Sequence, residues 1–171
     1  TNNIEGFFNI LEASRLSKIK HLIFASTSSV YGDTKKFPLK EKDNTDHPLS
    51  FYAASKKTNE VMAYSYSNIY KLPSTALRFF TVYGPYGRPD MALFKFTKAI
   101  LSNKSIKLFN KGNHFRDFTY IDDIVNGICS IILNPPNNKI PFAVYNIGSG
   151  KTQSLKTFIK VIEKTLNKKS I

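Results

Sequence analysis

The sequence contains a single cysteine, Cys129, among its 171 residues, so no disulfide bond can form within the chain. Such scarcity is typical of proteins that work in a reducing compartment. Cys129 lies in the apolar run 127–133, and we interpret it as a small buried side chain rather than a nucleophile.

Long apolar runs are missing as well. No stretch approaches the ~20 apolar residues that a membrane-spanning helix needs, so we expect no membrane partner. The chain begins TNNIEG, which has neither the basic nor the apolar region of a signal peptide. Together with the scarcity of cysteine, these absences predict a cytoplasmic protein.

Arginine is scarce in a chain whose net charge is +13, because four of the 25 basic residues are arginines. This charge is compatible with a nucleic-acid partner. The lysines, however, are scattered, without a dense basic block, a zinc ligand set or an aromatic–basic RNA-binding motif. We therefore expect solvated lysine faces and no nucleic-acid partner. Arg78, Arg88 and Arg116 stand in motif-like stretches, where a forked guanidinium suits phosphate or carboxylate.

The sequence also lacks the glycine-rich turn with which a dinucleotide-binding fold normally opens. No G-x-G-x-x-G run occurs between a predicted strand and a predicted helix. Gly148 and Gly150 follow a predicted strand, but the third glycine is absent, so this is a weak signal for a phosphate-binding turn.

Hydrophobic periodicity predicts helices that alternate with strands. The predicted helices are 4–16, 49–70, 91–101, 122–133 and 155–166, and the predicted strands are 19–25, 73–82, 106–109, 117–121 and 143–147. Residues 33–48 and 135–138 are predicted loops, and residues 112–116 a polar turn. The alternation favours right-handed crossovers and a parallel sheet. We expect strands 19–25 and 74–82 to be parallel neighbours, with helix 50–70 packed on them.

One stretch of the predicted helix 49–70 carries chemistry. Tyr52 and Lys56 are four residues apart and share a helix face, behind Ser50 as a plausible cap. An ammonium group beside a phenol favours the phenolate, which a base needs to take a proton from a hydroxyl. The alternative is an ordinary amphipathic helix with an exposed lysine.

A second polar stretch follows the predicted strand 19–25. Residues 26–29 are all hydroxyl residues, and they come at the carboxyl end of that strand, where open α/β sheets bind ligands. The alternative is a serine-rich loop without a ligand.

Five motifs occur in a characteristic order. They are STSSVYG at 26–32, YAASK at 52–56, LRFFTVYGP at 77–85, GRPDMALF at 87–94 and RDFTYIDD at 116–123. Together they resemble the extended short-chain dehydrogenase/reductases that act on nucleotide sugars, and the last two are similar to the UDP-glucuronate 4-epimerase branch. The resemblance covers essentially the whole chain.

The resemblance implies an α/β fold. Residues 1–84 would be the C-terminal part of a Rossmann-type NAD-binding domain with a parallel sheet, and residues 85–171 mainly a smaller α+β substrate-binding lobe. It also implies that the family's N-terminal phosphate-binding loop and its C-terminal end lie outside this chain. We therefore expect the chain by itself to be inactive.

The resemblance also implies site residues. Tyr52 resembles the catalytic base, Lys56 its partner, and Thr27 the hydroxyl residue that shares the proton of the sugar's C4 hydroxyl. Asn3 and Ser26 resemble cofactor contacts, as do Tyr52 and Lys56. The residues that resemble substrate contacts are Ser28, Ser29, Thr81, Arg88 and Arg116. No metal is implied.

The implied reaction is NAD-dependent C4 epimerisation of a UDP-sugar through a 4-keto intermediate, with UDP-glucuronate converted to UDP-galacturonate, in a homodimer that serves polysaccharide biosynthesis. Ser28 and Ser29 stand where the related dehydratases have Asp-Glu and the decarboxylases a glutamate, which argues against both. Two alternatives stay open. One is a 4-epimerase for UDP-glucose or UDP-N-acetylglucosamine, and the other is a non-catalytic fragment that binds nucleotide sugar weakly or associates through its sheet edge.

The arginines give a geometric expectation. If Arg88 and Arg116 hold the diphosphate and the uronate, both guanidinium groups should face the same cleft as Thr81, with Arg116 suited to the pyrophosphate. The alternative is that Arg116 forms a structural ion pair with Asp117 or Asp122.

Overall fold

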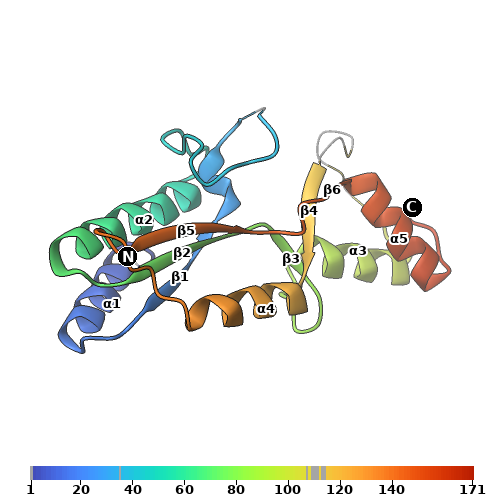
Figure 1. The fold of residues 1–171 in the computed structure, drawn as a ribbon. Helices are drawn as coiled ribbons and strands as arrows, with labels where there is room; N and C mark the ends of the chain where they lie inside the picture. The colour runs from blue at the N-terminus through green and yellow to red at the C-terminus, as the bar shows by residue number, and fades with distance from the viewer. Residues whose placement is uncertain (1, 35, 107, 109–111, 113–114) are drawn as a thin grey trace. The chain divides into compact units, whose positions relative to one another are not determined.

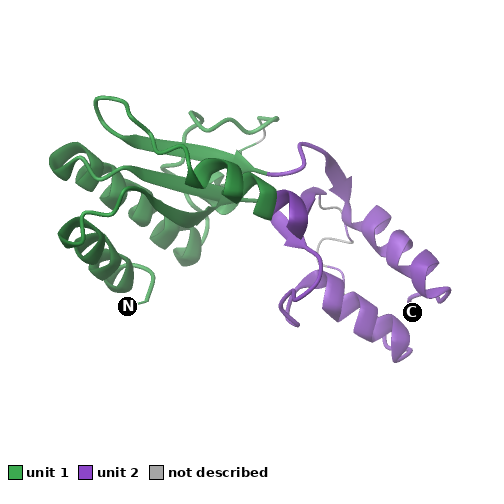
Figure 2. Cartoon of the chain, turned by 60° about the horizontal axis from the view of Figure 1, so that its bottom comes forward, with its two compact units in different colours: residues 1–80, 125–147 green, residues 81–124, 148–171 purple. Residues whose placement is uncertain are grey.

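The computed structural model describes residues 2–34, 36–106, 108, 112 and 115–171. The chain forms two compact units, residues 1–80 with 125–147 and residues 81–124 with 148–171 (Figure 2). The sequence placed a division at residue 84, whereas in the structure residues 125–147 lie with the first unit because the strand they contain joins its sheet. Among the described residues, no helix is long and apolar enough to cross a membrane.

The sheet of the first unit has three strands in the order β1-β2-β5, all parallel (Figure 1). They are β1 (Leu22–Thr27), β2 (Ser74–Phe79) and β5 (Phe142–Ile147). Leu22 lies opposite Ser74, and Ser74 opposite Phe142. The expected parallel pairing of the first two strands is thus confirmed.

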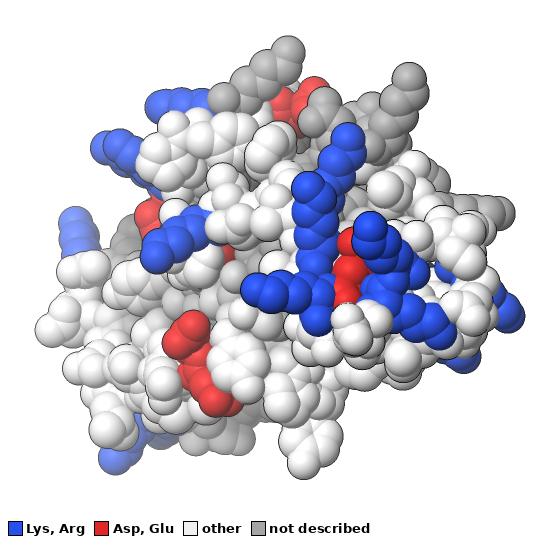
Figure 3. Space-filling view, turned by 90° about the vertical axis from the view of Figure 1, so that its right-hand side faces the viewer, with Lys and Arg blue, Asp and Glu red and all other residues white. Residues whose placement is uncertain are grey.

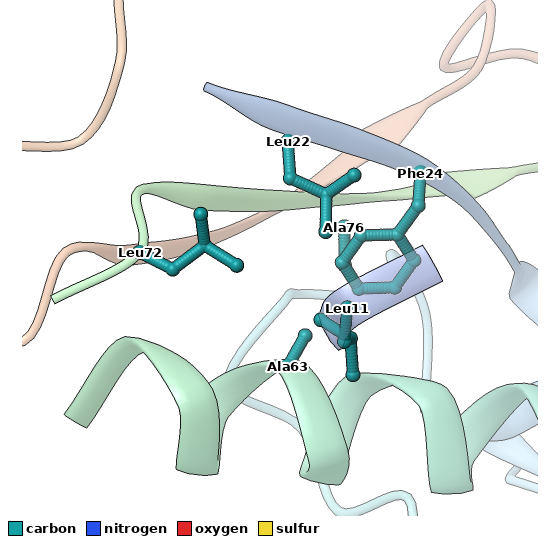
Figure 4. Packing of buried hydrophobic residues seen from close by; sticks show 6 residues of the cluster. All are labelled: Leu11, Leu22, Phe24, Ala63, Leu72 and Ala76. Atoms are coloured by element: carbon teal, nitrogen blue, oxygen red, sulfur yellow. The ribbon is translucent and has the colours of Figure 1, made fainter. Parts of the chain in front are cut away.

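Two helices, α1 (Glu5–Leu16) and α2 (Phe51–Tyr70), pack on one face of this sheet. The shared core consists of Leu11, Leu22, Phe24, Ala63, Leu72 and Ala76 (Figure 4). The predicted cap of α2 is confirmed, since the Ser50 hydroxyl accepts a hydrogen bond from the Ala53 amide at 3.1 Å. The antiparallel return of α2 brings its first turns to the carboxyl end of β1, where Lys56 reaches the Ala25 carbonyl.

The opposite face of the sheet receives the later part of α4 (Ile121–Ile132). His21 connects the two, because its ring nitrogens lie 2.8 Å from Thr75 Oγ1 and 3.3 Å from the Ile132 carbonyl. Gly127 faces Ile147 on the same side. Cys129 is exposed, so its interpretation as a buried residue was wrong. It lies two positions, about 200°, around the helix from Gly127 and therefore points away from the sheet.

The second unit is built around three short strands in the order β3-β4-β6. The strand β3 (Thr81–Tyr83) is parallel to β4 (Phe115–Tyr120), and β6 (Thr152–Ser154) is antiparallel to β4. Helices α3 (Ala92–Leu101) and α5 (Leu155–Leu166) complete the unit. The rings of Phe118 and Phe158 stack with centroids 4.2 Å apart, which fastens α5 to β4.

Several predicted boundaries change in the structure. The predicted strand 73–82 is two strands, because β2 ends at Phe79 and β3 pairs in the other sheet. The polar turn 112–116 is partly strand, since β4 begins at Phe115, and residues 113–114 lie outside the described residues. Residues 107 and 109 of the predicted strand 106–109 also lie outside them. The short helix η1 (Ser28–Tyr31) and β6 were not predicted.

Candidate functional site

The first cluster of predicted site residues lies where α2 begins and β1 ends, in the first unit. Lys56 Nζ donates a hydrogen bond to the Ala25 carbonyl at 3.0 Å, and burial lowers the pKa of Lys56. Tyr52 lies one turn earlier on the same helix face, with 51% of its surface exposed. The structure thus holds the ammonium at the strand end and leaves the phenol accessible.

The hydroxyl residues that follow β1 fold into one tight turn. Thr27 closes the strand in an extended conformation and caps η1, where its Oγ1 accepts from the Ser29 amide and donates to Ser29 Oγ, both at 3.2 Å. Thr27 is buried, Ser28 half-buried and Ser29 exposed. A hydroxyl oxygen accepts two hydrogen bonds, so Thr27 Oγ1 keeps one acceptor position beside the Ser29 contact.

A cavity of about 430 Å³ lies between the start of α1 and α2. Its lining residues are Asn2, Asn3, Gly6, Phe7, Ile10, Lys56 and Asn59. The Asn3 amide donates to Ser55 Oγ at 3.0 Å, which fixes the start of the chain against α2. The lining combines amide and ammonium groups with the apolar side chains of Phe7 and Ile10, which suits the hydroxyl groups and the flat ring of a nicotinamide riboside, so these residues fit that part of NAD.

Ser26 stands apart from this cavity, although it was predicted to contact the cofactor. It is 3% exposed, and its hydroxyl donates to Glu60 Oε1 at 2.6 Å. Glu60 and Asn59 were not singled out in the sequence. Their spacing of four and three residues from Lys56 was the available signal, because these offsets place residues on neighbouring parts of one helix face.

The second unit holds a smaller pocket of about 40 Å³. Thr81 and Arg88 both line it, and Phe94, Phe118 and Phe158 form an apolar wall. The Arg88 guanidinium donates to Asp90 at 3.0 Å and is otherwise exposed. A Cβ atom at Gly87 would lie 2.8 Å from the Phe94 ring, so this position requires glycine to keep the wall in place.

Arg116 does not line that pocket. Of the three residues expected in one cleft, the pocket thus brings together Thr81 and Arg88. Its guanidinium is exposed and donates to the Phe115 carbonyl at 2.8 Å. Among the described residues it has no acidic partner, and Asp117 points elsewhere. The Asp117 carboxylate accepts from Thr119 Oγ1, from the Ser149 amide and hydroxyl, and from the Gly150 amide, at 2.8–2.9 Å.

The lysines of α5 are spread over exposed surface. Lys156, Lys160 and Lys164 recur at four-residue spacing and are all exposed, and Figure 3 shows a face with many basic and few acidic side chains. Among the described residues, no group of three or more His, Cys, Asp or Glu side chains is placed to hold a metal ion.

Comparison with known proteins identifies relatives of this chain. The model of the family described as "NAD dependent epimerase/dehydratase family" matches residues 1–148. The chain is 52% identical to "Protein CapI" of Staphylococcus aureus, over 99% of this chain and 55% of that protein. It is 45% identical to the "Probable UDP-glucuronate 4-epimerase" of Rhizobium meliloti (strain 1021), over 99% and 54%.

One solved structure is also similar to this chain. The UDP-glucuronic acid 4-epimerase from Bacillus cereus, in complex with UDP-glucuronic acid and NAD, superposes with a TM-score of 0.91 at 38% identity. The match covers 99% of this chain and 53% of that one. The chain therefore spans about half the length of the proteins it matches.

Proposed function

The chain belongs to the NAD dependent epimerase/dehydratase family, and on that premise we propose that the protein containing it inverts C4 of a UDP-sugar with the help of NAD. The observation that carries the proposal is that Lys56 reaches the Ala25 carbonyl near the carboxyl end of β1 and also lines the cavity beside Asn3. Thr27 ends the same strand, and Tyr52 lies one turn before Lys56 on α2. UDP-glucuronate is the substrate we propose.

The residues of the first unit would divide the proton chemistry between them. Tyr52 Oη takes the proton of the C4 hydroxyl. Thr27 would orient the C4 oxygen by turning its own O–H, which donates to Ser29 Oγ at 3.2 Å, toward that oxygen. Lys56 Nζ, fixed on the Ala25 carbonyl one helical turn from Tyr52, would hold the hydroxyl groups of the nicotinamide ribose. Asn3 and Lys56 would hold NAD, which would supply the acceptor and donor for the C4 hydride.

The preference for a uronic acid rests on the turn 28–29. Oxidation at C4 of a uronate gives a β-keto acid, which loses CO₂ readily. The Ser28 and Ser29 hydroxyls lie next to Thr27 and supply hydrogen bonds, with no acid or base, to hold the carboxylate in place. In the second unit, the Arg88 guanidinium beside Thr81 suits a charged group of the same substrate, and we assign Arg116 to the pyrophosphate.

We further assign residues 1–84 to the NAD-binding domain and residues 85–171 mainly to the substrate-binding lobe, with 125–147 packing in the first unit. A homodimer in the cytoplasm is part of the same proposal. Sedimentation analysis of the whole protein tests the dimer.

Incubation of the whole protein with NAD and three UDP-sugars tests the proposed function. We expect conversion of UDP-glucuronate to UDP-galacturonate, with UDP-glucose and UDP-N-acetylglucosamine converted at least tenfold more slowly. If UDP-glucose or UDP-N-acetylglucosamine is converted faster than UDP-glucuronate, that neutral sugar nucleotide is the substrate. Nucleotide-sugar binding without conversion of any of the three would favour the non-catalytic alternative.

A further inference from the structure

A row of polar residues closes the core of the first unit at the carboxyl ends of its three strands. Ser26 on β1 lies directly opposite Arg78 on β2, and Arg78 lies opposite Asn146 on β5. Two residues earlier on each strand, the paired residues are Phe24, Ala76 and Val144, which belong to the apolar core or pack against it. The alternation along a strand therefore places the polar row on the face that α2 covers.

Glu60 of α2 meets this row. It is 4% exposed, and Arg78, 3% exposed, binds it as a fork, with Nε to Oε1 at 2.9 Å and Nη2 to Oε2 at 2.7 Å. Ser26 Oγ donates to Oε1 at 2.6 Å. Among the described residues, the side-chain hydrogen bonds to Glu60 thus come from two strand residues, 34 and 18 positions away in the sequence.

The remaining nitrogen of Arg78, Nη1, extends the row toward β5, at the other edge of the sheet. It donates to Tyr31 Oη at 2.9 Å and to the Glu41 carbonyl at 3.0 Å. Tyr31 in turn donates to Asn146 Oδ1 at 2.7 Å, and Asn146 Nδ2 donates to the Leu39 carbonyl at 3.1 Å. The end of η1 and the loop before α2 are therefore tied to the same pair.

Two consecutive residues of β1 are anchored to α2 in this way. Lys56 binds the Ala25 carbonyl, and Glu60, one helical turn later, binds the Ser26 hydroxyl. Thr27 is the next residue of the strand, and Tyr52 the preceding turn of the helix. Two anchors on adjacent strand residues fix both the rotation and the height of α2 against β1, which neither anchor fixes alone.

Packing of the core alone does not require an ion pair between Glu60 and Arg78. Apolar side chains of similar volume stabilise such a place as well or better, because the ion pair pays a desolvation penalty. What a forked ion pair supplies is one defined geometry. We propose that Glu60 and Arg78 are a positioning pair, which sets the separation of Tyr52 and Thr27 for the proposed C4 chemistry, and that the Ser26 hydroxyl serves Glu60. This inference rests on the proposed function.

The test compares three variants of the whole protein in steady-state kinetics with UDP-glucuronate and NAD. Glu60→Gln keeps the shape but turns an acceptor oxygen into a donor that faces Arg78. Ser26→Ala removes one hydroxyl and leaves the pair intact. Glu12→Gln is the matched control, since Glu12 also binds an arginine, Arg15, but lies on α1 outside the row.

For Glu60→Gln we expect kcat to fall about 10- to 100-fold with KM within about threefold, because misplacement of reacting groups acts on the chemical step. For Ser26→Ala we expect a fall in kcat of about three- to tenfold, with KM for NAD unchanged. Glu12→Gln should match the parent protein. A kcat of Glu60→Gln within twofold of the parent, or a raised KM for NAD with unchanged kcat in Ser26→Ala, would overturn the proposal. Ser26→Ala decides alone if Glu60→Gln fails to fold.

A second readout separates this proposal from the proposed function. If the parent protein converts no UDP-sugar, hydrogen exchange still reports the positioning. Glu60→Gln should speed amide exchange in residues 26–31 and leave residues 5–16 unchanged, whereas Glu12→Gln should not affect residues 26–31. Unchanged exchange in residues 26–31 of folded Glu60→Gln would contradict the positioning pair by itself.

Discussion

The two units of the chain use the same residue type in opposite ways. In the first unit, Arg78 is buried and reaches Glu60, Tyr31 and the Glu41 carbonyl, which lie 18 to 47 residues away in the sequence. In the second, Arg88 and Arg116 are exposed, and their described contacts are with residues one to three positions away. An arginine whose guanidinium binds residues of distant elements stabilises the fold. An arginine whose guanidinium is exposed can bind a ligand.

The difference extends to the site residues around these arginines. Lys56, Thr27 and Asn3 each have a partner within the first unit, so the proposed proton chemistry starts from a fixed arrangement. The 40 Å³ pocket of the second unit is too small for a sugar nucleotide. We therefore expect substitutions in the first unit to reduce turnover and those in the second to reduce substrate affinity.

The largest expected effect is that of Tyr52→Phe, which should lower kcat of the whole protein by about 10²- to 10⁴-fold, the usual contribution of a general base. The thermal midpoint should stay unchanged, because the phenol is half exposed. Tyr64→Phe is the matched control, on the same helix and 48% exposed. Equal kcat values for the two variants would remove Tyr52 from the mechanism.

The next effect concerns the stability of the second unit. Asp117→Asn should lower the free energy of unfolding by about 2–3 kcal/mol, because a buried carboxylate that accepts four hydrogen bonds would be replaced by an amide. Urea denaturation measures the loss. Asp122→Asn, an exposed position in the same unit, should cost less than about 1 kcal/mol. Similar losses for both would show that the Asp117 contacts contribute little.

A smaller effect is expected on substrate affinity, from the exposed arginines of the second unit. Arg88→Lys and Arg116→Lys should each raise Kd for UDP-glucuronate about five- to tenfold, since lysine keeps the charge but loses the forked contact. The Kd for NAD should stay constant, which calorimetry can follow for both ligands. Arg15→Lys serves as the control on α1. Equal losses of affinity for sugar nucleotide and NAD would instead indicate a structural role.

The smallest expected effect is a loss of folding stability at high pH, when Tyr66 ionises. Burial, together with the hydrogen bond to the Glu12 carboxylate, raises the pKa of Tyr66 to about 12. The neutral phenol is favoured in the folded state, so its contribution to stability is complete below pH ~10 and is lost as the pH rises toward 12. NMR titration of ¹³Cζ-labelled tyrosine should show Tyr66 titrating at lower pH in Glu12→Gln. An unchanged titration would mean that Glu12 has no part in the shift.

Local signals in the sequence predicted much of the first unit. Ser50 was identified as a cap because its contact lies three residues away, and the parallel pairing of β1 and β2 followed from the order of helices and strands. The break at Phe80 was missed, since residues 77–83 carry no turn residue and their division depends on partners in two different sheets.

The candidate site shows the same limit. Tyr52, Lys56 and Thr27 stand in short motifs, and the roles assigned to them stay predictions. The assignment of Ser26 to the cofactor did not anticipate Glu60, because the motif gives the residue type but not the partner that reaches it from α2. Arg78 stood in a motif just as Arg88 did, and only burial separated an internal ion pair from an exposed guanidinium.

The central claim is that the fixed groups of the first unit support oxidation and reduction at C4 of the sugar. The most direct measurement is ¹H NMR of the UDP-galacturonate that the whole protein forms from UDP-glucuronate in D₂O. We expect protium at C4 of the product, because the hydride would leave and return to the same carbon while Tyr52 exchanges only the hydroxyl proton. Deuterium at C4 would contradict it.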